Sequence, residues 1–160
     1  MTSPTVSAVL FDLDGTLIDT APEFIHIGLQ LRAEAGLPPI DAKTIWQSVS
    51  NGAIGMVEAA LEMPADDPAF EQWRQRFLTL YETGLGDLSH PYPGLPELVA
   101  GLHKAGIAWG VVTNKLSRFA LPLMDKMPFD PAAGAVVTPA HVDQPKPLSL
   151  IHISEPTRRR

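Results

Sequence analysis

The stretch that sets the fold is FDLDGTLIDT, Phe11 to Thr20. It continues a short apolar and β-branched run, and this pattern predicts a buried parallel strand over Val6 to Asp12. Two carboxylates, Asp12 and Asp14, stand at the end of that strand, separated by a single residue. Like charges this close repel each other and lose hydration when buried, so we expect a compensating partner.

A helical block follows the first strand. Apolar residues recur at helical spacing up to Gly36, and Thr20 to Glu23 resembles a capping box at the start of this helix. No strand pattern occurs between Asp19 and Leu88, so the block is predicted to be an insertion. Further helical patterns cover Asp41 to Ser50, Ala53 to Leu61 and Ala69 to Tyr81.

Helices and strands then alternate after a stiff connector, HPYPG, at residues 90–94. Such alternation predicts an α/β fold with a parallel, Rossmann-like sheet and right-handed crossovers. The predicted elements are a helix over Leu95 to Ala105, a strand over Ile107 to Val112, a helix over Leu116 to Met127 and a strand over Ala135 to Thr138.

Composition narrows the class of protein. The chain has 160 residues, a formal net charge of −6 and no cysteine, so we expect neither a nucleic-acid partner nor a thiolate metal site. The amino-terminal residues lack the pattern of a signal peptide, and no apolar run approaches the ~18 residues of a membrane span. We therefore expect a cytoplasmic protein without a membrane partner, and the sequence leaves its oligomeric state unknown.

The last thirteen residues, 148–160, differ in pattern from the rest. LSLIHISEPTR, Leu148 to Arg158, resembles the translation of a transposase adapter used in sequencing libraries. An ordinary strand with a basic end is the alternative. We expect the natural sequence to stop near Pro147, and residues 148–160 are left out of the fold prediction.

Polar residues cluster where the strands of such a sheet end. Asp12 and Asp14 follow the first strand, Thr113 and Asn114 follow the second, and Lys146 comes after the third. A divalent cation between the two carboxylates would offset their repulsion, and Mg²⁺ prefers hard oxygen ligands of this kind. The sequence therefore predicts a magnesium site held by the aspartates.

Phosphoryl transfer through an aspartyl-phosphate fits this set of residues. Asp12 would be the nucleophile, and Asp14 would protonate the leaving oxygen and then activate water. Thr113 is expected to donate to phosphoryl oxygens, and Lys146 to balance their charge. Simpler roles stay open: a solvated turn for the aspartates, a helix N-cap for Thr113, a loop position for Lys146 and a solvated helix face for Arg118.

Three motifs resemble those of the haloacid-dehalogenase superfamily: DLDGTL from Asp12, VVTNK ending at Lys115, and KP at Lys146. The resemblance implies a Mg²⁺-dependent enzyme with a core of residues 1–18 and 91–147 and an α-helical cap of residues 19–90. Within the superfamily the chain is similar to phosphoglycolate phosphatases and to the branch that acts on N-acetylmuramic acid 6-phosphate.

The resemblance also assigns the site. It implies a phosphatase of a small phosphorylated metabolite, with catalytic residues Asp12, Asp14 and Lys146. The substrate-binding residues that it implies are Thr16, Thr113, Asn114 and Arg118.

The acidic fourth motif of the superfamily is missing before residue 148. We therefore expect the 160-residue chain to be inactive and poorly soluble, with an exposed apolar edge on its first strand. Two alternatives to a phosphatase stay open: a non-catalytic scaffold that binds a phosphorylated ligand, and an inactive fragment.

Overall fold

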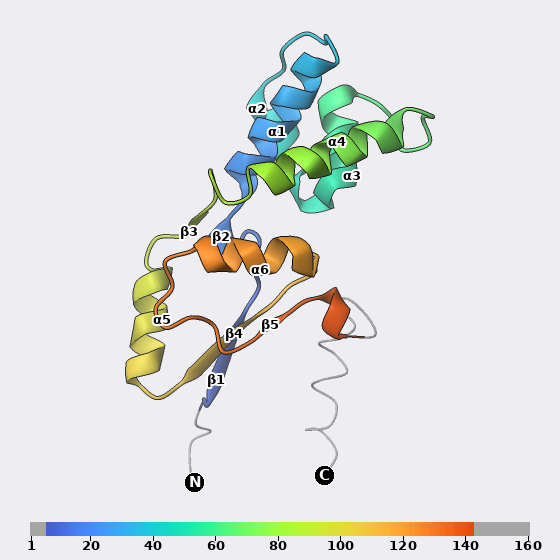
Figure 1. The fold of residues 1–160 in the computed structure, drawn as a ribbon. Helices are drawn as coiled ribbons and strands as arrows, with labels where there is room; N and C mark the ends of the chain where they lie inside the picture. The colour runs from blue at the N-terminus through green and yellow to red at the C-terminus, as the bar shows by residue number, and fades with distance from the viewer. Residues whose placement is uncertain (1–5, 143–160) are drawn as a thin grey trace. The chain divides into compact units, whose positions relative to one another are not determined.

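The chain divides into two compact units (Figure 1). The structure is a computed structural model and describes residues 6–142. Of the described residues, unit 1 contains those up to Asp19 and from His90 onward, and unit 2 contains Thr20–Ser89. The predicted tail, residues 148–160, lies outside the described residues, and the assignment of core and cap roles to the units stays a prediction.

Unit 1 has a parallel sheet with strand order β1-β4-β5 and a separate antiparallel pair, β2-β3. This confirms the predicted α/β class. The elements are β1 (Ala8–Phe11), β2 (Ile18–Asp19), β3 (His90–Pro91), α5 (Leu95–Lys104), β4 (Ala108–Val112), α6 (Ser117–Lys126), β5 (Val136–Val137) and a short 3₁₀ helix, η2 (Pro139–His141).

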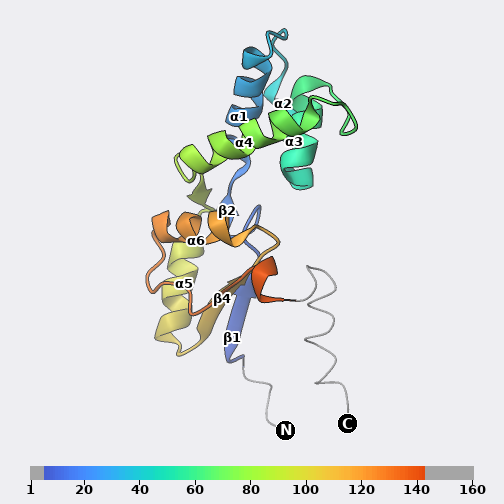
Figure 2. The same cartoon turned by 45° about the vertical axis from the view of Figure 1, so that its right-hand side comes forward.

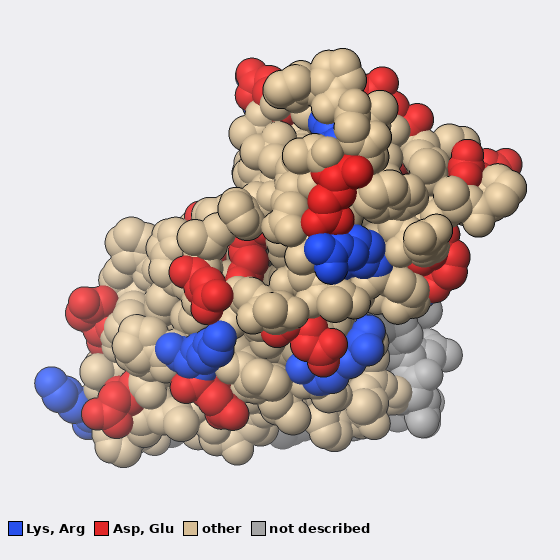
Figure 3. Space-filling model, turned by 45° about the horizontal axis from the view of Figure 1, so that its top comes forward, with Lys and Arg blue, Asp and Glu red and all other residues tan. Residues whose placement is uncertain are grey.

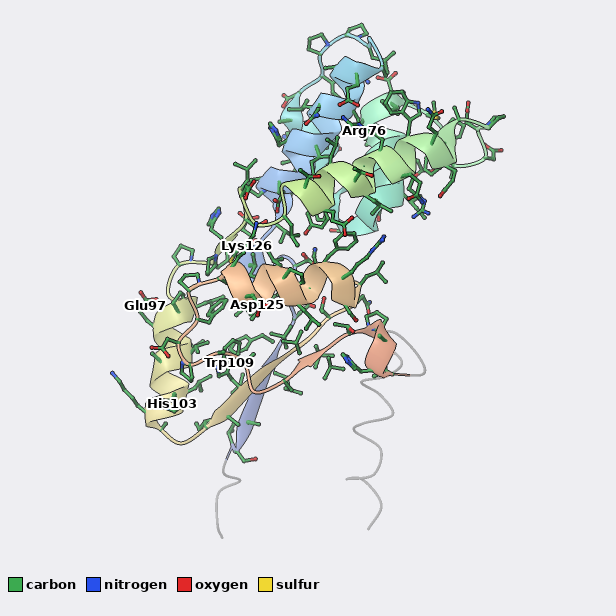
Figure 4. All side chains as sticks on the ribbon, viewed as in Figure 1. Arg76, Glu97, His103, Trp109, Asp125 and Lys126 are labelled. Carbon is green, nitrogen blue, oxygen red and sulfur yellow. The ribbon has the colours of Figure 1, made fainter. Side chains whose placement is uncertain are left out.

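Helices α5 and α6 lie on the same face of this sheet (Figures 1 and 2). The strand order advances in one direction, so two right-handed crossovers place both helices on one side. Trp109 of β4 is buried and packs its ring against Phe129, with the ring centroids 5.4 Å apart (Figure 4). Its indole Nε1 donates to the carbonyl of Pro131 at 3.1 Å.

The first strand is only half covered, although its pattern predicted a buried strand. Residues of β1 alternate between exposed and partly buried, and Leu10 is 59% exposed. Among the described residues, β1 pairs only with β4 and so forms one edge of the sheet. Helices α5 and α6 cover one face of the sheet, so the β1 residues on its other face stay exposed although they are apolar.

The antiparallel pair β2-β3 was missed by the sequence analysis, which treated residues 90–94 as a connector. Ile18 pairs with Pro91, and the amide of Tyr92 donates to the carbonyl of Leu17 at 3.2 Å. Burial chiefly, and the charge of Asp19 in addition, raise the pKa of Tyr92. Strands of two residues carry no detectable periodicity, and this pairing joins residues far apart in the sequence.

Unit 2 is a helical bundle. Its core includes three stacked aromatic rings, with Phe24 4.9 Å from Tyr81 and 5.8 Å from Phe77 between centroids. The confirmed helical block consists of α1 (Ala21–Glu34), α2 (Ala42–Trp46), α3 (Gly52–Leu61), α4 (Phe70–Thr83) and a 3₁₀ turn, η1 (Val49–Asn51).

The helix predicted over Asp41 to Ser50 is shorter than expected. Asp41 caps α2 by accepting a hydrogen bond from the amide of Lys43 at 2.8 Å, and α2 ends at Trp46. Trp46, the last residue of this helix, is 57% exposed. The chain then turns at Gly52, whose φ of 62° suits glycine.

The predicted capping box at the start of α1 does not form. Thr20 has a helical backbone conformation and makes no side-chain cap bond. The carboxylate of Glu23, which is buried, instead accepts hydrogen bonds from the hydroxyl of Ser89 and from the amide of Asp87 at 3.3 Å. A tertiary contact with the other end of unit 2 has replaced the local one.

A buried guanidinium joins three parts of unit 2. Arg32 of α1 is 5% exposed, and it donates to the carbonyls of Pro38 and of Ala60, the latter at 2.8 Å. It also forms an ion pair with Glu62 at 2.9 Å. The guanidinium thus meets two main-chain carbonyls and one carboxylate.

Charged side chains are intermixed on the face shown in Figure 3, where Lys and Arg lie next to Asp and Glu. An ion pair also joins α1 and α4: Arg76, labelled in Figure 4, donates to both oxygens of Glu34 at 2.8 and 2.9 Å. Within residues 6–142, none of the helices has both the length and the apolar composition needed to span a membrane.

Candidate functional site

The three parallel strands of unit 1 end at one edge of the sheet. Phe11 pairs with Val111, and the last residues of β4 and β5 pair with each other. Asp12, Thr113 and Thr138 are the residues that follow the three strands. The sheet therefore brings the predicted aspartate and threonine positions to the same edge, where reactive groups of α/β proteins gather.

The aspartates occupy a tight turn rather than the extended chain that their spacing suggested. The carbonyl of Leu13 accepts the amide of Ile18 at 3.0 Å, and Gly15 turns the chain with a φ of 73°. Leu13 is fully buried, while Asp12 is exposed and Asp14 is partly exposed. The buried leucine anchors the turn, so the carboxylates on either side of it face outward.

One lysine that the sequence analysis did not assign to the site reaches the second aspartate. The Nζ atom of Lys115 lies 2.8 Å from Oδ1 of Asp14, and the lysine side chain is 6% exposed. The amide of Lys115 donates to the hydroxyl of Thr113 at 3.0 Å. A lysine directly after the Thr113–Asn114 pair was the signal that could have identified it.

Thr113 is buried at the end of β4, and its predicted role stays a prediction. It is 4% exposed, and its amide donates to the carbonyl of Val137 at 2.9 Å. Its Oγ1 accepts the amide of Lys115, and a hydroxyl that accepts one hydrogen bond can still donate its own hydrogen. A phosphoryl oxygen is an acceptor of the expected kind.

The other predicted residues are less closely tied to this group. Thr16, Asn114 and Arg118 are exposed, and the guanidinium of Arg118 lies 4.6 Å from the ring centroid of Phe119. Neither Thr16 nor Arg118 forms a hydrogen bond to the aspartates among the described residues. Lys146 lies outside the described residues, so its predicted role stays a prediction.

A second polar network lies beside Thr113. The hydroxyls of Ser117 and Thr138 are 2.6 Å apart, and Nδ1 of His141 accepts the amide of Thr138 at 3.1 Å. Thr138 is 1% exposed. This network caps η2 and fixes the start of α6 against the end of β5, so we assign it a structural role.

The donor set fits a magnesium ion in part. Within the described residues, no three acidic or histidine side chains form a metal-binding group. Mg²⁺, however, is held in many proteins by one or two carboxylates together with water and substrate phosphate. Asp12 and Asp14 supply two hard oxygen ligands at an outward-facing turn, so they are the residues that would hold the ion.

Comparison with known proteins agrees with this geometry. The family model for the haloacid dehalogenase-like hydrolases matches residues 9–152, which is most of the chain. The chain belongs to that family. The match runs past residue 148, where the adapter-derived tail is predicted to begin, and the boundary of that tail stays a prediction.

Two curated members of the family illustrate the likeness. N-acetylmuramic acid 6-phosphate phosphatase of Pseudomonas aeruginosa is 49% identical over 142 residues, which is 89% of this chain and 63% of that protein. Phosphoglycolate phosphatase of Caulobacter vibrioides is 34% identical over 134 residues, or 82% of this chain and 56% of that protein. The chain thus spans less than two thirds of the length of each of these two relatives.

Solved structures of the family share the fold. The crystal structure of a predicted phosphoglycolate phosphatase from Haemophilus somnus superposes with a TM-score of 0.76 at 21% identity, covering 95% of this chain and 72% of that one. CbbY from Rhodobacter sphaeroides, solved with phosphate, gives 0.65 at 19% identity, covering 94% and 71%. At these identities the likeness concerns the fold alone.

Proposed function

We propose that the protein hydrolyses a small phosphate monoester through an aspartyl-phosphate. One observation carries the proposal: Asp12 is exposed at the end of β1, one residue from an Asp14 whose carboxylate is held by Lys115. Membership of the hydrolase family and the phosphatase relatives support it. A cytoplasmic location belongs to the same proposal.

The chemistry takes two steps. In the first, a carboxylate oxygen of Asp12 forms a bond to phosphorus, the ester P–O bond breaks, and Asp14 gives its proton to the leaving oxygen. In the second, Asp14 takes a proton from water as that water forms a bond to phosphorus. The bond from Asp12 to phosphorus then breaks, which releases inorganic phosphate and restores the carboxylate.

Other residues stabilise the phosphoryl group as negative charge moves within it. The hydroxyl of Thr113 donates to a phosphoryl oxygen, and Lys146 supplies positive charge. Thr16, Asn114 and Arg118 are proposed to contact the substrate. A Mg²⁺ ion held by the Asp12 carboxylate and by an oxygen atom of Asp14 that carries no proton would neutralise part of the phosphate charge when bound.

Two substrates follow from the relatives. Phosphoglycolate fits the sequence-based expectation, while the higher identity to the P. aeruginosa enzyme, 49% against 34%, favours an amino-sugar phosphate. Turnover of phosphoglycolate and of N-acetylmuramic acid 6-phosphate, compared at equal concentration in the protein expressed from its gene, decides between them.

The test of the mechanism is Asp12→Asn in the protein expressed from its gene. We expect turnover to fall by at least ~10³-fold, because the amide is not a competent nucleophile. Asp125→Asn, which changes an exposed aspartate of α6 (Figure 4), is the matched control and should keep full activity. Acid-quenched wild-type protein should carry one phosphoryl group on Asp12, as mapped by mass spectrometry.

Unchanged turnover in Asp12→Asn would remove the nucleophile assignment. If the folded protein binds the phosphate esters but never turns them over, the non-catalytic scaffold is the better description. The prediction that the 160-residue chain is inactive has its own test, since turnover of an aryl phosphate by this chain with Mg²⁺ would contradict it.

A further inference from the structure

The side chain of Lys115 is held at both ends. Its backbone amide donates to the hydroxyl of Thr113 at 3.0 Å, and its ammonium lies 2.8 Å from the carboxylate of Asp14. The two charged residues are 101 positions apart in the sequence, so this contact joins the end of β4 to the turn after β1.

The burial of this pair is uneven. The Lys115 side chain is 6% exposed, whereas the Asp14 side chain is 35% exposed. A buried ammonium requires a partner, because an unpaired charge in the interior is strongly unfavourable. The carboxylate does not depend on the lysine in this way, since water reaches it. The contact with Lys115 therefore also fixes the direction of the Asp14 carboxylate.

We propose that Lys115 is a positioning residue, which orients Asp14 for proton transfer to the leaving oxygen. This inference rests on the proposed function, in which Asp14 is the acid and base. Oδ1 is bonded to the lysine, so the carboxyl group cannot rotate freely and its other oxygen is presented in one direction. A misaligned proton donor loses most of its catalytic effect.

A leaving-group comparison separates positioning from other roles. An alkyl phosphate releases a strongly basic alkoxide, which requires protonation as the P–O bond breaks. Nitrophenyl phosphate releases a stable phenolate, which leaves without that proton. Loss of Asp14 orientation should therefore slow alkyl phosphates and spare nitrophenyl phosphate.

The variants are Lys115→Met, which keeps the length of the side chain without its charge, and Lys115→Arg, which keeps the charge. In the protein expressed from its gene, Lys115→Met should lower kcat for an alkyl phosphate by ~100-fold and for nitrophenyl phosphate by less than ~3-fold, with KM unchanged. Lys115→Arg should recover most of the alkyl activity. Lys104→Met, at the exposed end of α5, is the matched control.

Two kinetic results would overturn the inference. Equal losses for both substrates, with a raised KM, would mean that Lys115 grips the phosphoryl group rather than Asp14. Full activity of Lys115→Met on the alkyl phosphate would mean that the contact has no part in the reaction.

A measurement without turnover tests the contact itself, again in the protein expressed from its gene. In lysine labelled with ¹⁵N, the Lys115 ammonium should give a signal protected from solvent exchange, and Asp14→Asn should shift or broaden it. A signal unaffected by Asp14→Asn would refute the pairing. If the contact is present but Asp12→Asn keeps full turnover, the proposed function fails while the pairing stands.

Discussion

The two units each contain a buried cation, and their partners differ. Arg32 in unit 2 donates to two main-chain carbonyls and pairs with Glu62, while Lys115 in unit 1 pairs with Asp14. The folded backbone fixes the positions of these carbonyls, so Arg32 holds α1 against the segments that contain Pro38 and Ala60. The lysine pairs with a carboxylate on a partly exposed turn, and that carboxylate is proposed to take part in the reaction. The comparison therefore distinguishes Arg32, which stabilises the fold of unit 2, from Lys115, which is proposed to orient a reacting group.

The largest loss of stability should come from replacing Arg32, the buried cation of unit 2. Arg32→Met leaves the carbonyls of Pro38 and Ala60 without their donor, and the buried carbonyl of Ala60 left unpaired costs ~1–3 kcal/mol. Urea unfolding should show a loss of ~3 kcal/mol. Lys115→Met should lose less than ~1 kcal/mol, because water can solvate Asp14. Equal losses in the two variants would erase the contrast.

A smaller effect is expected in the sheet that supports the lysine. A Cβ atom added at Gly110 of β4 would lie 2.9 Å from the carbonyl oxygen of Ala135, so one strand must shift. Gly110→Ala should therefore lower the stability of unit 1 by ~1–3 kcal/mol. Gly101→Ala in α5 is the matched control, since nothing lies within 4 Å of its added Cβ. A control as damaging as Gly110→Ala would contradict this explanation.

The smallest effect should come from an exposed pair of unit 2. Hydrogen bonds from Arg76 lower the pKa of Glu34 from 4.5 to about 2. The folded state therefore gains stability from the carboxylate above pH 4.5, and this gain is lost as the pH falls from 4.5 toward 2. Glu34→Gln should lower the melting temperature by about 1–2 °C at neutral pH and by much less near pH 2, where the folded-state carboxylate is partly protonated. An undiminished difference at pH 2 would exclude the ion pair as its cause.

The sequence predicted the features whose signals are local. The apolar runs located β1, β4 and β5, and the polar residues that follow them located the edge where Asp12 and Thr113 lie. The helical spacing of apolar residues located the block of unit 2. In each case one short segment contains the whole signal.

The features it missed depend on contacts between distant segments. Glu23 matches a capping box locally, but the hydroxyl of Ser89 and the amide of Asp87 are its partners in the fold. Lys115 ends the VVTNK motif, yet its contact with Asp14 cannot be predicted from the positions of the two residues in the sequence. The exposed face of β1 likewise follows from which elements cover the sheet.

The hydrogen bond between Ser89 and Glu23 bears on whether the helical segment could be exchanged for another one. These residues are 66 positions apart, yet they touch, so the helical segment starts and finishes at nearly the same point. Joining two such close ends with a short linker would impose little strain on the strands outside it. The segment is therefore an exchangeable module, and grafting a foreign bundle between Asp19 and His90 should leave the sheet intact.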